Sequence, residues 1–194
     1  VRNNYEAFIT KLDPTGSSLV WSTYLGGNAA DHGEDLILAQ DGGLVVVGYT
    51  YSDNFPVSPG AADISYNDNR DVFVAKLNAT GDALDWASYL GGADNDNRYA
   101  LALDASEQIY LTGTTDSDDF PTTSGAWDRS YGGGFYGDAF VAKLNATATH
   151  LDWATYLGGE DNDHGQDIAV DSSVYVYVPG STKSEDFPAP SGAF

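Results

Sequence analysis

The chain has 194 residues, 29 of them acidic and only eight Lys or Arg, which gives a formal net charge of −21. This balance argues against nucleic acid and against insertion into or binding to an anionic membrane, because both partners select clustered basic side chains. The absence of cysteine excludes disulfides, thiol catalysis and cysteine-held zinc.

The first expected elements are two strands, AFITKL at 7–12 and LVWSTYL at 19–25, joined by the turn Asp-Pro-Thr-Gly at 13–16. A short strand, DLILA at 35–39, precedes LVVVGYT at 44–50, with Asp-Gly-Gly between them. Such turns favour hairpins because glycine accepts positive φ at no steric cost. A long segment from about 51 to 70, containing Phe-Pro and Gly-Ala, separates these strands from the next one.

The same order of elements then returns twice. Trp21, Trp86 and Trp153 are 65 and then 67 residues apart, and residues 71–97 match residues 138–164 at 20 of 27 positions. Self-similarity at a fixed period is typical of repeat architectures. We therefore predict a single repeat array over 1–194, with repeats at about 5–70, 71–137 and 138–194.

Four short antiparallel strands per repeat, with glycine-rich turns, predict an all-β fold of β-propeller blades. The phrases DAFVAKLN, LDWATYLGG, DIAVD, VPGST and DFPAPSGAF resemble the bacterial and archaeal β-propeller repeat known as the SBBP repeat. In propellers of this kind the IAVD strand is the innermost, strand A, followed outwards by B, C and D. The chain then has the phase CD-ABCD-ABCD-AB, which predicts three repeats in an incomplete ring or open array.

The resemblance implies a secreted or cell-surface protein and brings no catalytic residues. An unpaired CD or AB half-blade exposes a sheet edge that favours association. Three partners for these halves stay open: further blades of the same polypeptide, a second copy that closes a six-bladed ring, or head-to-tail copies in a filament. We expect an extracellular structural or adhesive module, with a glycan- or protein-binding propeller as the alternative and a polysaccharide-active enzyme as the third reading.

Acidic residues follow each YLGG phrase, at Asp31, at Asp94 and Asp96, and at Asp161 and Asp163. Their oxygens and spacing make them candidate ligands for Ca²⁺, although the later positions of an EF-hand loop are missing. The alternative is that the carboxylates of Asp31, Asp96 and Asp163 cap the tight connection between strands D and A.

Two asparagines, Asn78 and Asn145, begin Asn-Ala-Thr sequons in expected turns and are candidate glycosylation sites. The first repeat has Asp13 at this position, so turn formation is the alternative reading.

Recurring aromatic residues are expected to pack between blades, since each ring buries a large apolar area; stacking on sugars is the alternative. They are Trp21, Trp86, Trp153, Tyr24, Tyr89, Tyr156, Phe55, Phe120 and Phe187.

Overall fold

The computed structural model describes residues 4–135 and 137–190, which contain strands and turns but no helix. The first pair of strands is β1 (Ala7–Leu12) and β2 (Leu19–Leu25), which are antiparallel. A four-stranded antiparallel sheet follows, in the order β3 (Asp31–Leu38), β4 (Leu44–Thr50), β5 (Asp71–Leu77) and β6 (Leu84–Leu90). No helix in this part of the chain is long and apolar enough to cross a membrane.

A second four-stranded sheet has the order β7 (Asp96–Leu103), β8 (Ile109–Thr115), β9 (Asp138–Leu144) and β10 (Leu151–Leu157). The chain then forms two short pairs, β11 (Asp163–Gly165) with β14 (Gly180–Thr182), and β12 (Ala169–Val170) with β13 (Val176–Tyr177). The predicted phase CD-ABCD-ABCD-AB and the all-β class are therefore confirmed, and the described residues form an open array without a closed ring.

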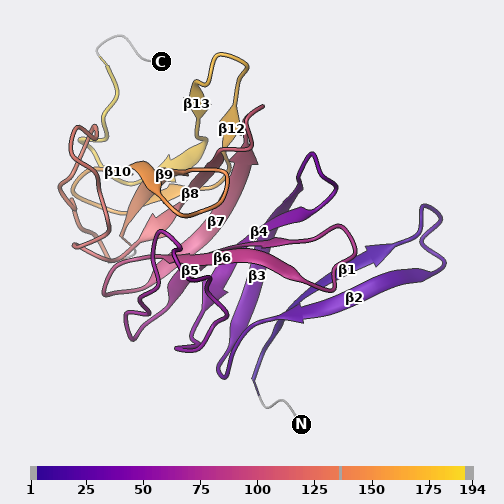
Figure 1. The fold of residues 1–194 in the computed structure, drawn as a ribbon. Helices are drawn as coiled ribbons and strands as arrows, with labels where there is room; N and C mark the ends of the chain where they lie inside the picture. Colours follow the sequence, from indigo (N-terminus) through magenta and orange to yellow (C-terminus); the bar gives the residue numbers. More distant parts are fainter. Residues whose placement is uncertain (1–3, 136, 191–194) are drawn as a thin grey trace.

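The sheets stand side by side in chain order, like blades around an incomplete ring (Figure 1). Their innermost strands meet, since β3 contacts β7 and β7 contacts β11. The two middle strands of each complete blade are buried on both faces, as in β4 and β8. This double burial explains the apolar run at the start of β4, LVVV, because neither face meets water.

Strand A is longer than we predicted from the sequence in the two complete blades. β3 and β7 begin at Asp31 and Asp96, four residues before DLILA and ALALD. The carboxylate of Asp31 explains the extension of β3, because it accepts a hydrogen bond from the Thr50 hydroxyl at the end of β4. The acidic segments that follow YLGG therefore continue from the turn into strand A of the sheet.

In the last half-blade, Pro179 stands where β4 has Val47 and β8 has Thr112. Proline has no backbone N–H to donate to a strand ladder. The A–B pairing is accordingly split into β11–β14 and β12–β13 on the two sides of this residue.

Candidate functional site

A carboxylate closes each connection from strand D to the next strand A. The Oδ2 atoms of Asp31, Asp96 and Asp163 accept hydrogen bonds from the backbone N–H of the second glycine of YLGG, at 2.8, 3.1 and 2.8 Å. All three carboxylates are buried. They act as caps that satisfy the backbone where the chain passes from one blade to the next.

A second buried carboxylate faces the caps Asp96 and Asp163 across the first glycine of YLGG. A Cβ on Gly91 would lie 2.6 Å from Asp96 Oδ2 and 3.0 Å from Asp71 Oδ1. A Cβ on Gly158 would likewise lie 2.8 Å from Asp163 Oδ2 and 3.0 Å from Asp138 Oδ1. Glycine is required there because any side chain would collide with both carboxylates.

Burial changes the protonation of these pairs. It raises the pKa of Asp96 to about 8 and the pKa of Asp71 to about 7, and it raises the pKa of Asp138 to about 7. Within the described residues, Oδ1 of Asp71, Asp96 and Asp138 has no hydrogen-bond partner. Such carboxyls hold a proton near neutral pH because a low dielectric disfavours the charged form.

The candidate calcium ligands separate into two environments. Asp94 and Asp161 are exposed, whereas Asp31, Asp96 and Asp163 are buried. Among residues 4–135 and 137–190, no three His, Asp or Glu side chains lie close enough to hold one metal ion. Sequence reasoning missed Asp71 and Asp138 as the neighbours of the caps, because each lies 25 residues before its partner in the chain.

The recurring phenylalanines and tyrosines form the same cluster in both complete blades. Phe55 lies against Phe73 with ring centroids 4.5 Å apart, and Phe120 lies against Phe140 at the same distance. The hydroxyl of Tyr89 donates to the carbonyl of Ser52 at 2.8 Å. Its counterpart in the next blade, Tyr156, donates to Ser117 at 2.8 Å.

The tryptophans occupy the opposite face of strand D. Trp21 packs into the apolar cluster between the first two sheets, and Trp86 packs into the cluster between the second and third. Trp153 packs between the third sheet and the last half-blade. Each complete blade is therefore held to its neighbours by tyrosine on one face and tryptophan on the other.

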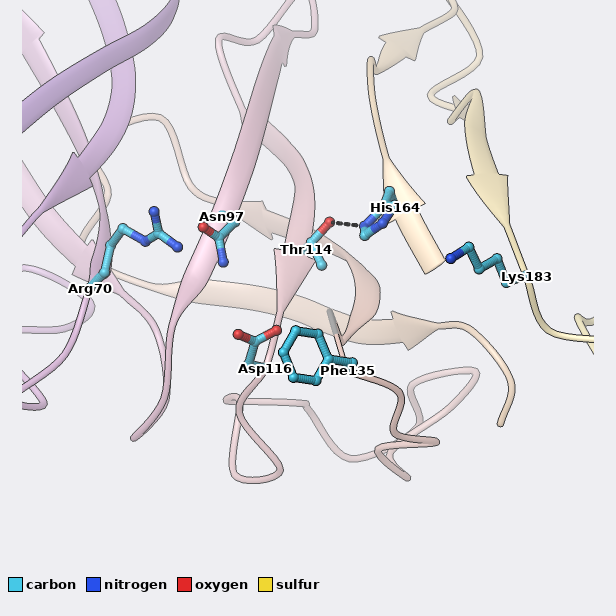
Figure 2. Close-up of a pocket in the computed structure, with 7 residues that line it drawn as sticks. All are labelled: Arg70, Asn97, Thr114, Asp116, Phe135, His164 and Lys183. Atoms are coloured by element: carbon cyan, nitrogen blue, oxygen red, sulfur yellow. Dashed lines mark hydrogen bonds between the residues drawn. The ribbon is translucent and has the colours of Figure 1, made fainter. Parts of the chain in front are cut away.

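A cavity of about 680 Å³ opens between the inner ends of the second, third and last blades, and we call it the inner cavity. Figure 2 shows Arg70 and Lys183 entering it from opposite sides, with Asp116 and Phe135 close together below. His164 of β11 and Thr114 of β8 share a hydrogen bond of 3.1 Å at its wall.

The model of the SBBP β-propeller repeat matches residues 85–121 and 152–188. Each match begins in a D strand and ends at the proline of a Phe-Pro pair, Pro121 or Pro188. The chain therefore contains SBBP β-propeller repeats.

A curated relative of this SBBP protein is the "Regulatory protein FlaEY" of Caulobacter vibrioides, which is 28% identical over 177 residues. The match covers 91% of this chain and 18% of the relative. The chain therefore spans about a fifth of the length of the curated relative it matches.

The first SBBP half-blade leaves its aromatic face open. Phe8 and Tyr24 are 69% and 64% exposed, whereas the equivalent Phe73 and Tyr89 are buried. Tyr24 thus differs from our expectation of packing between blades. The reason is that β1 pairs only with β2 within the described residues, so no strand B or Phe-Pro segment covers this face.

In the last SBBP half-blade, the phenylalanine that would cover such an aromatic face is itself less buried than in the complete blades. Phe187 is only partly buried, although its equivalents Phe55 and Phe120 are buried. It lines a small pocket with Val178 and Ala139. The first half-blade therefore lacks a phenylalanine over Phe8 and Tyr24 within the described residues. The last half-blade carries such a phenylalanine, Phe187, which is less buried than its equivalents.

Both sequon asparagines are engaged in turns. Asn78 donates from Nδ2 to Asp82 Oδ1 at 2.8 Å and accepts from the Asp82 N–H. Asn145 likewise donates to the Thr149 hydroxyl at 2.9 Å. Asp13 accepts hydrogen bonds at the same position of the first repeat, from Ser17 among others. Glycosylation would have to replace the Nδ2 contacts.

Proposed function

We propose that the chain is a non-catalytic, extracellular or cell-surface structural module that assembles by completing blades between copies. The β1–β2 half of one copy supplies strands C and D to the A–B half, β11–β14, of another. The observation that carries the proposal is the exposed pair Phe8 and Tyr24, which stands where complete blades bury Phe73 and Tyr89. The SBBP repeats and the name of the relative favour a role without catalysis.

The complete blades give the contacts that such a joint would make. Phe187 would stack on Phe8, as Phe55 stacks on Phe73. The Tyr24 hydroxyl would donate to the Ser184 carbonyl, as Tyr89 donates to Ser52. Burying a Phe side chain of this kind is worth roughly 1.5–3 kcal/mol.

The backbone offers the second part of the joint. In the complete blade, strand B pairs with strand C along seven residue pairs from Leu44↔Leu77 to Thr50↔Asp71. In the first half-blade, β1 is the strand C whose inner edge, the edge that pairs with strand B in a complete blade, has no partner among the described residues. An open edge of this type accepts a strand from another chain with main-chain hydrogen bonds. Because the contact joins two different surfaces, copies would associate head to tail.

The proposal is tested by measuring the mass of the 194-residue polypeptide in solution over a range of concentrations. We expect oligomers that Phe8→Glu dissociates, because a charge at this position cannot enter the apolar cluster. Ile64→Glu is the matched control, since Ile64 is 64% exposed, close to the 69% of Phe8, and belongs to the segment between β4 and β5 and to neither half-blade.

Electron microscopy then distinguishes a two-copy ring from a filament. Circular dichroism of each variant verifies that it is folded. A wild-type monomer at high concentration, or equal effects of the two substitutions, would contradict assembly through this face.

A further inference from the structure

We propose that the inner cavity binds a saccharide that carries a carboxylate, such as a uronic or sialic acid unit. This proposal does not depend on assembly, because the walls of the cavity come from strands and segments of one copy. Three features carry it: concentrated positive charge, an arginine held by aromatic rings, and adjacent groups suited to a sugar ring.

Basic groups are scarce in this chain, yet they meet at the inner cavity. Two of the eight Lys and Arg residues, Arg70 and Lys183, line it together with His164. In a protein with a net charge of −21, a local site of opposite sign is the place where an anion is favoured. Figure 2 shows the ends of the Arg70 and Lys183 side chains directed into the same space.

Arg70 is held in position by aromatic rings, and the charge of Asp116 in the same cavity acts on it from beyond ion-pair distance. Its guanidinium carbon lies 4.8 Å from the ring centroid of Tyr49 and 6.0 Å from that of Tyr51. Within the described residues no carboxylate forms an ion pair with Arg70, and its buried Nε has no hydrogen-bond partner. A planar guanidinium fixed on aromatic rings is suited to bind a carboxylate through paired hydrogen bonds.

The rest of the cavity suits a ring with hydroxyl groups. Asn97 and Thr114 present an amide and a hydroxyl, and one oxygen of Asp116 is buried without a hydrogen-bond partner among the described residues. Phe135, which is 84% exposed, offers a flat apolar surface for the C–H face of a sugar. Because Asp116 repels anions, the carboxylate of the ligand belongs between Arg70 and Lys183, and highly charged ligands such as nucleic acid are disfavoured.

The lining of the cavity uses positions that recur in successive repeats, such as Asn97 with His164, but the charged residues at these positions differ between repeats. Lys183 corresponds to Asp116 and Tyr51 in the other repeats, and Arg70 corresponds to Gly137. The capping aspartates and the YLGG glycines, by contrast, are the same in every copy. The cationic lining is therefore particular to this place in the array, as expected of a binding site and not of a packing position.

The test is a titration of the 194-residue polypeptide, followed by NMR or calorimetry, with trigalacturonate and sialyllactose as acidic probes. Maltotriose and lactose are the neutral counterparts. We expect at least one acidic probe to bind, and Arg70→Gln and Lys183→Gln each to weaken its binding roughly tenfold or more. Arg129→Gln is the matched control, because it removes the same charge from an exposed residue outside the cavity.

Lys183 is exposed, so Lys183→Gln tests the site even if Arg70→Gln disturbs folding. Failure of both acidic probes to bind, equal binding of the neutral sugars, or an equal loss in Arg129→Gln would each overturn the proposal. The variant Phe8→Glu should bind the acidic probe normally, which separates this site from assembly.

Discussion

At the scale of single residues, the buried carboxylates make the stability of the blades depend on pH. Folding raises the pKa of Asp96 to about 8 because the side chain is buried. The folded state then holds a proton that the unfolded chain releases near pH 4. Since the unfolded chain binds fewer protons in this range, the free energy of unfolding falls as the pH rises from about 4 to about 8.

Asp96→Asn should remove much of this dependence. The amide oxygen can still accept the Gly92 N–H, but no charge has to be buried at high pH. We expect the free energy of unfolding at pH 8 to increase by on the order of 1–2 kcal/mol. Denaturant unfolding between pH 5 and pH 8 measures the change.

The exposed Asp94 provides the control, because Asp94→Asn alters the net charge by the same amount two residues away. An equal gain in both variants would attribute the effect to general charge repulsion and not to burial.

At the scale of secondary-structure elements, the hairpins between strands A and B place different residue types at a turn position with positive φ. Gly42, Glu107 and Val174 occupy the same turn position with φ values of 82°, 58° and 68°. A β-branched residue is disfavoured at positive φ because its Cβ crowds the backbone.

Val174→Gly should therefore stabilise the hairpin of β12 and β13 by about 1 kcal/mol. The converse substitution Gly42→Val should destabilise the hairpin of β3 and β4. Thermal unfolding of the two variants should move in opposite directions, and a loss of stability in Val174→Gly would contradict this account of the turn.

The sequence was sufficient to predict the order and phase of these elements, because apolar strands and glycine turns are local signals that recur three times. It did not predict the early start of β3, since this depends on the contact of Asp31 with Thr50 across the sheet. The pairing of Asp71 with Asp96 was missed for the same reason. Nor could periodicity locate the inner cavity, because the residue types at its lining positions change from one repeat to the next.

At the scale of the whole molecule, stability should decrease from the complete blades towards the half-blades. The middle strands β4, β5, β8 and β9 are buried on both faces, whereas β14 is exposed. In repeat arrays stability depends on contacts with the nearest neighbours. The half-blades have fewer of these contacts.

Amide hydrogen exchange should therefore be slowest in β4, β5, β8 and β9 and fastest in β11–β14 and at the unpaired inner edge of β1. If the polypeptide assembles through its half-blades, protection of β1 and β14 should rise with protein concentration. Uniform exchange across all strands would show that the array unfolds as one unit.

The offset between the repeated sequence and the folded blade has a consequence for how such arrays change in length. Each blade is made from the end of one repeat and the beginning of the next, and the long segments at 51–70 and 116–137 lie between strands B and C. Recombination within these segments would add or remove a whole repeat while creating the same kind of B-to-C junction. Arrays of different lengths could thus arise without a new core or a new interface having to be selected.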